Sequence, residues 1–415
     1  MGIRRRRRHH QRGFTLVLLA TIFTVVLLGV FVSVISVKSA QLLADEKTAS
    51  ALASAREALT AYAATHPTLP GRLPCPDNNG DGVADCGPAG LNAIGRLPWK
   101  TLGIPDLRDA SGECLWYAVS ANFREDAAGP VNSDSTGNFE IRDDPALADP
   151  GTTKYIAGPA AQTRAIAIVF APGPVLDTHD RVPGGSVCGT YNIAADFLDT
   201  KYGINNAAPA TVGVATFVGG KAEDSTPGFN DRLVYLTPAQ FFPPVERRVA
   251  GEIKKTLLVY YSLNGYYPYA NDLSDATLNC TSSNPRRGRV PLSISSGCSS
   301  LAEWPTALPA WFTSQQWNLL TYYAVASACT AATPTAPTSP PTCGGTGYLT
   351  LQGSATPTNN QVVVIEPGAA LFGQTSPCTA IVNCLEGINA DNLDDNFEIQ
   401  TSSPSFNDVV VVITP

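Results

Sequence analysis

The stretch RRRRRHHQRGFTLVLLATIF, residues 4–23, places a block of arginines directly before a long apolar run. That run, Phe14 to Val37, has 24 residues and no charged side chain before Lys38. At about 1.5 Å of rise per residue, a helix of this length would cross a hydrocarbon core of roughly 30 Å. Because the run continues into helix-forming sequence and has no small-residue cleavage site at its far end, it predicts a retained transmembrane helix over residues 14–37.

The charges around this run predict its orientation. Six arginines precede it and one lysine follows it closely, so the positive-inside rule places the N-terminus in the cytoplasm and exports the rest. The ten cysteines all lie in the exported part, a usage that favours disulfides. Close pairs are Cys75/Cys86, Cys280/Cys298, Cys329/Cys343 and Cys378/Cys384, with Cys114 and Cys188 left over, although spacing alone fixes no connectivity.

The segment RGFTLVLL, residues 12–19, followed by an unbroken apolar helix, resembles the processing site of type IV pilins and type II secretion pseudopilins. The resemblance implies that a prepilin peptidase cuts between Gly13 and Phe14. It also implies a single-pass protein of the bacterial inner membrane, with periplasmic C-terminal domains and other pilins or pseudopilins as partners. A plain signal anchor with a chance Gly-Phe pair is the alternative interpretation.

One departure from the family pattern concerns the fifth mature position. The family carries glutamate there, and this chain has Leu18. In the family the glutamate is thought to offset the N-terminal charge of a neighbouring subunit, a role that fits the high cost of a buried unpaired charge. Without it the chain is expected to be a poor repeating subunit, and the resemblance then implies a large minor subunit at the filament tip.

Helical periodicity continues past the apolar run, from Ala40 to His66, with no glycine or proline until Pro67. A single helix from Phe14 to His66 would be on the order of 80 Å long. Its first half would lie in lipid and its second half on a globular head, which is the pilin architecture.

An internal comparison predicts a tandem duplication in the remaining chain. FNDRLVYLTP, residues 229–238, recurs as FNDVVVVITP at residues 406–415. Other matches keep the same order: residues 95–99 with 288–292, 115–120 with 321–327, 165–173 with 362–368, 188–199 with 384–394, and the helix from Ser54 with that from Val245. The boundary is expected near Pro243-Pro244, since proline is tolerated in the first turn of a helix.

A helix followed by strand-like runs predicts an α+β, pilin-like fold. The expected architecture is a long N-terminal helix, membrane half plus amphipathic half, on an antiparallel sheet, with a second tandem pilin-head-like domain. The predicted domains are a basic leader at residues 1–13, a transmembrane helix at 14–37, a first head with its helix at 38–242 and a second head at 243–415.

The loop CPDNNGDGVADC, residues 75–86, predicts a calcium site. Side-chain oxygens occur at Asp77, Asn79, Asp81 and Asp85, and Val83 can offer its backbone carbonyl, which matches the early positions of an EF-hand-type loop. The twelfth position is Pro88 instead of the usual bidentate glutamate, so another group must complete the shell. The alternative is a solvated Asn/Gly/Asp turn without a metal.

The charge balance and the motifs narrow the function. The formal net charge is −7, and loss of the six leader arginines would leave 22 basic against 35 acidic residues, or −13, which disfavours nucleic-acid binding. The sequence contains neither a G-x-S-x-G nor an H-E-x-x-H motif, so no enzyme is predicted. The expected function is a minor pilin or pseudopilin subunit of a type II secretion or type IV pilus filament. The alternative is a membrane-tethered binding protein, such as an adhesin, that uses the prepilin signal.

Overall fold

The computed structural model gives the fold of most of the 415-residue chain. It describes residues 11–143, 154–177, 179–181, 193–219, 228–281, 286–330, 343, 347–353, 359–371, 373–377, 379–391 and 394–414, with the backbone alone for residues 11–16 and 28–37.

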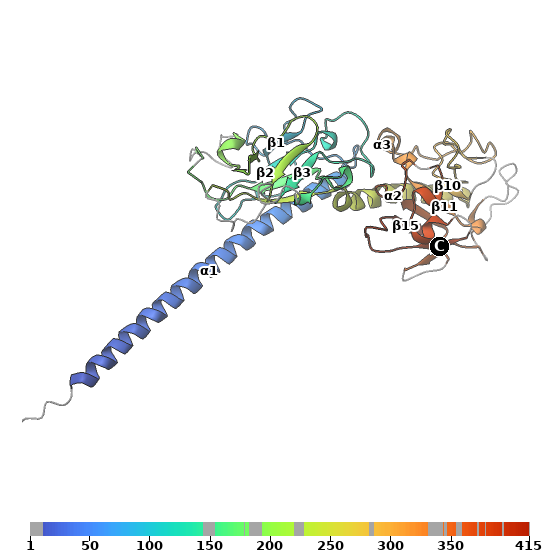
Figure 1. Ribbon diagram of the computed structural model, residues 1–415. Helices are drawn as coiled ribbons and strands as arrows, with labels where there is room; N and C mark the ends of the chain where they lie inside the picture. Colours follow the sequence, from blue (N-terminus) through green and yellow to red (C-terminus); the bar gives the residue numbers. More distant parts are fainter. Residues whose placement is uncertain are drawn as a thin grey trace, which may run out of the picture.

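Helix α1 (Gln11–Thr65) is 55 residues long, and its N-terminal part projects away from the rest of the molecule (Figure 1). Two lobes follow along the chain. The first lobe runs from the C-terminal part of α1 to strand β9, and the second runs from helix α2 (Pro238–Asn264) to strand β15. The lobes lie side by side, with α2 passing from one to the other (Figure 1).

Each lobe contains one four-stranded antiparallel sheet. In the first lobe the order is β1 (Ala93–Arg96), β2 (Trp116–Val119), β5 (Ala167–Ala171) and β9 (Arg232–Leu236). In the second lobe the order is β10 (Arg287–Arg289), β11 (Tyr322–Val325), β13 (Val362–Glu366) and β15 (Val409–Ile413). The strands at corresponding places are those formed by the matched sequence segments, so the two sheets share both strand order and pairing.

Three smaller sheets complete the described architecture. The first lobe holds β4 (Tyr155–Ala157), β3 (Phe139–Arg142) and β8 (Ala215–Val218) in one sheet, and β6 (Thr200–Lys201) with β7 (Ile204–Asn205) in another. The second lobe holds β12 (Thr350–Gln352) with β14 (Asn396–Glu398). The pairs β3–β8 and β12–β14 are parallel.

The expected α+β, pilin-like fold is therefore wrong. The described chain is β-rich, with five small sheets of mixed type in place of a pilin sheet behind a long N-terminal helix. The reason is that the segments between the matched strands form strands of two to four residues, and some of these pair in parallel with distant partners, as β3 does with β8 and β12 with β14. Such short strands carry too few residues for an alternating pattern to reveal them.

Helix α2 begins earlier than the sequence indicates. The side chain of Gln240 accepts a hydrogen bond from the backbone N–H of Thr237 at 3.3 Å, and Pro238 occupies the first turn. Thr237 is therefore the N-cap of α2. Its free backbone N–H is satisfied by Gln240, and Pro238 at the first helical position has no N–H that needs a partner. Pro243 and Pro244 lie inside α2, so a boundary between residues 242 and 243 would cut a continuous helix.

The remaining helices are short. They are α3 (Ala310–Ser314) and the 3₁₀ turns η1 (Ala121–Phe123), η2 (Ala161–Thr163), η3 (Ala194–Asp196), η4 (Trp317–Leu319), η5 (Ser327–Cys329), η6 (Ile381–Asn383) and η7 (Gly387–Ala390).

One apolar core continues through both lobes. Phe241 and Phe242, near the start of α2, are its link. Phe241 packs against Phe123 of the first lobe with ring centroids 5.7 Å apart, and Phe242 packs against Trp317 of the second lobe at 6.4 Å. Because both phenylalanines are almost fully buried, each stabilises the folded chain by about 1.5–3 kcal/mol.

Three of the suggested disulfides form, namely Cys75–Cys86, Cys280–Cys298 and Cys329–Cys343. Cys114 and Cys384 are also disulfide-bonded. Cys378, the suggested partner of Cys384, lies outside the described residues, as does Cys188, which was left over together with Cys114.

Candidate functional site

The predicted calcium loop lies beside strand β1. Asp77 pairs with Arg96 of β1 through two backbone hydrogen bonds, Asp77 N to Arg96 O at 2.9 Å and Arg96 N to Asp77 O at 2.8 Å. The disulfide between Cys75 and Cys86, with Cα atoms 5.1 Å apart, closes the loop. Both ends of the loop are therefore fixed to the first lobe.

The buried carboxylate of Asp77 organises the turn. Its Oδ1 accepts hydrogen bonds from the backbone N–H groups of Asn79 at 3.0 Å and Gly80 at 2.6 Å, and its Oδ2 accepts one from Gly82 at 2.7 Å. Gly82 has a φ of +87°, and a Cβ there would lie 2.5 Å from the indole Nε1 of Trp99. Only glycine meets both the backbone conformation and the close approach.

Three of the five predicted ligands come together. Carboxylate oxygens of Asp77, Asp81 and Asp85 lie within 4.8 Å of one another. Asn79 and Val83 lie in the same turn, where Asn79 Oδ1 accepts from the N–H of Asp81 at 2.9 Å and the N–H of Val83 donates to Asp81 Oδ1 at 2.7 Å.

The donor set suits a hard divalent cation. Carboxylate and amide oxygens are the ligands that calcium prefers, and three carboxylates this close repel one another unless a cation offsets their charge. One nearby cation belongs to the protein itself, because Lys100 donates through Nζ to the backbone carbonyl of Asp81. Lys100 would therefore compete electrostatically with a metal bound at this loop.

The second lobe has a different loop at the corresponding place. Asn271 pairs with Arg289 of β10 through the same two backbone hydrogen bonds, each 2.9 Å. The loop reads NDLSDATLNC, so Asn271 stands where the first lobe has Asp77, and Leu273 stands where it has Asn79. Among the described residues, one other cluster of potential metal ligands lies close enough together, and it consists of Cys75, Cys86 and Glu125. Its two cysteines are joined in a disulfide.

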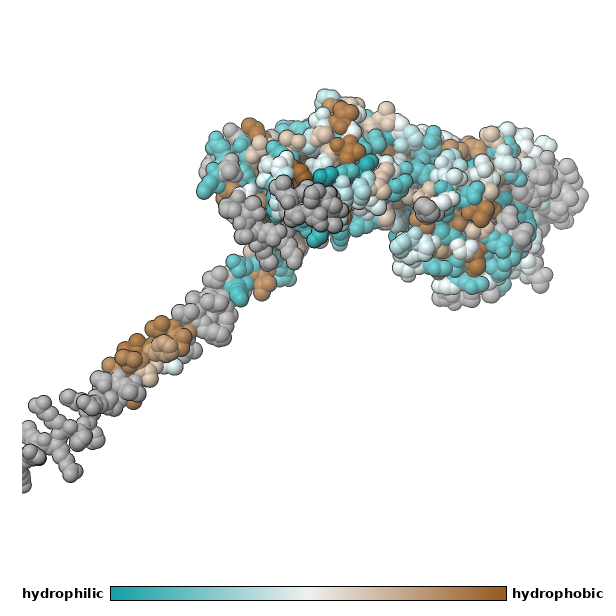
Figure 2. All heavy atoms as spheres, viewed as in Figure 1, coloured by the Kyte–Doolittle hydropathy of each residue, from teal (hydrophilic) through white to brown (hydrophobic). Residues whose placement is uncertain are grey.

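The predicted processing site lies at the start of α1. Gly13 and Phe14 fall within the helix, but their side chains lie outside the described residues. From Val17 to Leu27 the side chains are exposed; Leu18 has an exposed fraction of 50% and Leu19 of 73%. The projecting part of α1 accordingly shows apolar surface where it is described (Figure 2).

Within the part of the chain that the structure describes, no helix combines the length and the apolar character needed to cross a membrane. The predicted span at residues 14–37 includes residues 14–16 and 28–37, whose side chains lie outside that part.

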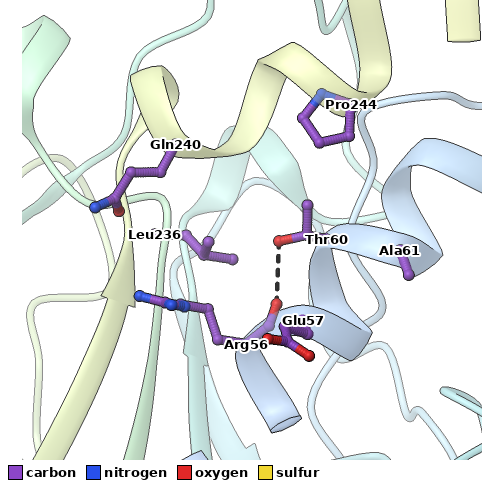
Figure 3. A pocket seen from close by; sticks show the side chains of 7 residues that line it. All are labelled: Arg56, Glu57, Thr60, Ala61, Leu236, Gln240 and Pro244. Carbon is purple, nitrogen blue, oxygen red and sulfur yellow. Dashed lines mark hydrogen bonds between the residues drawn. The ribbon is translucent and has the colours of Figure 1, made fainter. Parts of the chain in front are cut away.

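A cavity of about 510 Å³ opens where α1, β9 and α2 meet (Figure 3). Its charged lining residues are Arg56 and Glu57 of α1, and Gln240 and Pro244 of α2 line the opposite side. Thr60 donates through its hydroxyl to the carbonyl of Arg56 at 3.0 Å, so its polar group is already used. The lining presents no pairing of a nucleophile with a base, and the cavity does not support a catalytic assignment.

Each lobe contains a pair of buried acids that was not predicted from the sequence. Asp199 and Asp231 face one another in the first lobe, and Glu386 and Asp408 do so in the second. The available signal was the repeated Phe-Asn-Asp motif, whose aspartates are residues 231 and 408. The hydrogen bonds also show that Asp199 corresponds to Glu386, so the sequence match of residues 188–199 with 384–394 was in the wrong register.

No family model, curated protein or solved structure matches this chain.

Proposed function

We propose that this chain is a prepilin-processed assembly protein, a minor subunit of a type II secretion or type IV pilus filament. In this proposal a prepilin peptidase cuts between Gly13 and Phe14, the apolar segment inserts into the bacterial inner membrane, and both lobes lie in the periplasm. The proposal concerns processing and assembly, and it does not depend on a pilin fold in either lobe.

The observation that carries the proposal is the exposed apolar stem of α1. Val17, Leu19 and Val25 have exposed fractions of 61%, 73% and 67%, and they lie at different angles around the helix. Each such side chain gains about 1.5–3 kcal/mol on leaving water. A helix that is apolar all round requires lipid or neighbouring helices around it. In this proposal the membrane supplies the lipid before assembly, and the filament core supplies the neighbouring helices afterwards.

Two further features support this function. Disulfides in both lobes suit an oxidising compartment. Leu18 offers the N-terminus of a neighbouring subunit no acidic partner of the kind that the resemblance implies for repeating subunits, which favours a single copy at the tip.

Calcium is a second part of the proposal. The Asp77 loop would hold the ion through Asp77, Asp81 and Asp85, with Asn79 and the carbonyl of Val83 as the further predicted ligands. Bound calcium would offset the carboxylate repulsion and stiffen the part of the first lobe next to β1.

Mass spectrometry of the N-terminus, after expression with and without a prepilin peptidase, tests the proposal. The mature chain should begin at Phe14 only when the peptidase is present, and Gly13→Leu should leave the precursor uncut. Gly2→Leu is the matched control and should be processed normally. An intact Met1 in the presence of the peptidase, or a cut beyond residue 37, would reject the assignment.

Antibody labelling of filaments distinguishes a subunit at the filament tip from a subunit along the shaft. Signal from the second lobe at one end of each filament is expected. Signal along the shaft would reject the tip, and processed protein that never labels filaments would favour a membrane-tethered binding protein.

A further inference from the structure

The two acids in the first lobe form a reciprocal clasp, the first-lobe clasp. The backbone N–H of Asp199 donates to Asp231 Oδ2 at 2.8 Å, and the N–H of Asp231 donates to Asp199 Oδ2 at 3.1 Å. Asn206 Nδ2 also donates to Asp231 Oδ2, at 3.0 Å. The clasp ties the start of edge strand β9 to the segment after η3, and all three side chains are buried.

The second lobe repeats this arrangement with other residues, as the second-lobe clasp. The N–H of Glu386 donates to Asp408 Oδ2 at 3.1 Å, and the N–H of Asp408 donates to Glu386 Oε2 at 3.1 Å. Asn389 Nδ2 donates to Asp408 Oδ2 at 2.9 Å. This clasp holds the start of edge strand β15, which corresponds to β9.

Each clasp also accepts a backbone N–H, from Asn230 in the first lobe and Asn407 in the second. One further side chain reaches each clasp, and it differs in kind. In the first lobe His179 Nε2 lies 2.8 Å from Asp199 Oδ1, with exposed side-chain fractions of 3% and 1%. In the second lobe Gln374 Nε2 donates to Glu386 Oε1 at 2.6 Å. Imidazole can take up a proton near neutral pH, whereas an amide cannot.

The surroundings of His179 determine which ring nitrogen carries hydrogen. Nδ1 faces two donors, the backbone N–H of Leu176 at 3.4 Å and Arg181 Nη2 at 3.1 Å. Nδ1 must therefore accept, and the single N–H lies on Nε2 toward Asp199. Gln374 has the same polarity, since its Oε1 accepts from the N–H of Leu371 at 2.7 Å. The glutamine thus reproduces the neutral histidine.

We propose that His179 makes the first-lobe clasp acid-sensitive, whereas Gln374 leaves the second-lobe clasp without a corresponding proton switch. Protonation of His179 would put an N–H on Nδ1 against the N–H of Leu176 and the guanidinium of Arg181. One of these contacts must then break. In acid the start of β9 should open more readily than it does with glutamine at position 179.

The charged groups around the ring act in opposite directions. Burial is the main cause that lowers the pKa of His179, and Arg181 lowers it further, while Asp199 and Asp196 raise it. Arg181 is in turn paired with Glu113 at 3.4 Å. Because the pKa is lowered on folding, the neutral ring stabilises the lobe fully above about pH 6.5, and this contribution is lost as the pH falls toward the folded value.

Asp231 titrates in the same cluster and must be separated from His179. Burial and the neighbouring Asp199 raise its pKa to about 8, so acid favours the clasp through Asp231 while it opposes the clasp through His179. A comparison of variants at equal pH cancels the Asp231 contribution.

Amide hydrogen exchange of the full-length chain in detergent micelles tests the proposal with a reciprocal pair of variants. For residues 229–236, His179→Gln and wild type should be protected equally at pH 7.5, and the variant should be about tenfold better protected at pH 5.0. For residues 406–413, Gln374→His should be equally protected at pH 7.5 and about tenfold less protected at pH 5.0. A protection ratio that does not change with pH, or equal changes in both lobes, would overturn the proposal.

Nitrogen NMR of the wild-type imidazole gives a second reading that needs no variant. At pH 7 the His179 ring should be neutral, with its proton on Nε2, and it should titrate below pH 6.5. A charged ring at pH 7, or a proton on Nδ1, would contradict the proposal even if a variant failed to fold.

Discussion

The loops DNNGDGVADC, residues 77–86, and NDLSDATLNC, residues 271–280, have the same length and the same place in the two lobes. Each begins with a residue that pairs with an arginine of the first sheet strand, Asp77 with Arg96 and Asn271 with Arg289. The first loop brings three carboxylates together. The second has an amide and a leucine at the first and third positions.

The difference separates what the scaffold requires from what the site requires. The backbone pairing survives the change from Asp77 to Asn271, because it uses main-chain atoms. Both lobes also have a glycine directly before the paired arginine, Gly95 in the first lobe and Gly288 in the second. A Cβ on Gly95 would lie 2.7 Å from the carbonyl oxygen of Asp77, and one on Gly288 would lie 1.9 Å from that of Asn271. The side chains of Asp81 and Asp85 belong to the metal site proposed for the first lobe, whereas the carboxylate of Asp77 also accepts the backbone hydrogen bonds that hold its turn.

The largest effect expected is that of calcium on the first lobe. At a concentration a hundredfold above the dissociation constant, calcium should stabilise the folded state by about 2.7 kcal/mol. Chelator should remove this gain, which a thermal melt with and without calcium measures. Asp81→Ala should abolish the difference.

Asp275→Ala in the second lobe is the matched control for this experiment. Asp275 belongs to the corresponding loop and accepts from the backbone N–H of Thr277 at 2.8 Å. The variant should keep the full calcium response. Equal loss of response in both variants would mean that calcium does not distinguish the loops.

A smaller effect is expected from the pH dependence of the first-lobe clasp. Because the pKa of Asp231 is raised to about 8 on folding, the folded state holds a proton that the unfolded chain releases near pH 4, and stability falls as the pH rises toward 8. Between pH 6.5 and 8 the contribution of Asp231 is about 2 kcal/mol, at about 1.4 kcal/mol per unit. His179 is neutral in this window and adds little.

Asp231→Asn imitates the protonated acid and should remove that share of the slope. Urea unfolding at pH 6.5 and pH 8 measures it, with Asp408→Asn as the corresponding change in the second lobe. Burial likewise raises the pKa of Asp408, with Glu386 as a further cause. An unchanged slope in both variants would show that neither clasp holds an extra proton.

The smallest effects concern the ties between each helix and its edge strand. Arg232 of β9 pairs with Asp45 of α1 at 2.6 Å, with exposed side-chain fractions of 35% and 65%. Lys254 of α2 instead donates to the carbonyl of Val412 in β15 at 2.8 Å. Arg232→Ala should cost about 0.5 kcal/mol, and less at high salt, while Lys254→Ala should cost about 1 kcal/mol. Chemical denaturation in low and high salt measures both, and a larger, salt-independent loss for Arg232→Ala would contradict the comparison.

Several features could be read directly from the sequence because their cause is local. The apolar run before Lys38 follows from composition, and the acid loop follows from the spacing of Asp77, Asp81 and Asp85 along one turn. Three disulfides were suggested by close spacing. The repeated Phe-Asn-Asp motif, residues 229–231 and 406–408, indicated equivalent strands, though its chemical role was not apparent.

Other features were decided by tertiary structure, because their partners are far apart in the chain. The parallel pair β3–β8 joins segments more than seventy residues apart, and no local pattern specifies such a register. The two prolines that seemed to mark a boundary lie inside helix α2, where Phe241 and Phe242 pack against Phe123 and Trp317, residues far away in the sequence. His179 meets Asp199 across twenty residues. The sequence alone determined which titratable side chains were available. Burial in the folded lobe determined whether each of them holds or releases a proton, because a charge without a partner is costly only after water has been excluded.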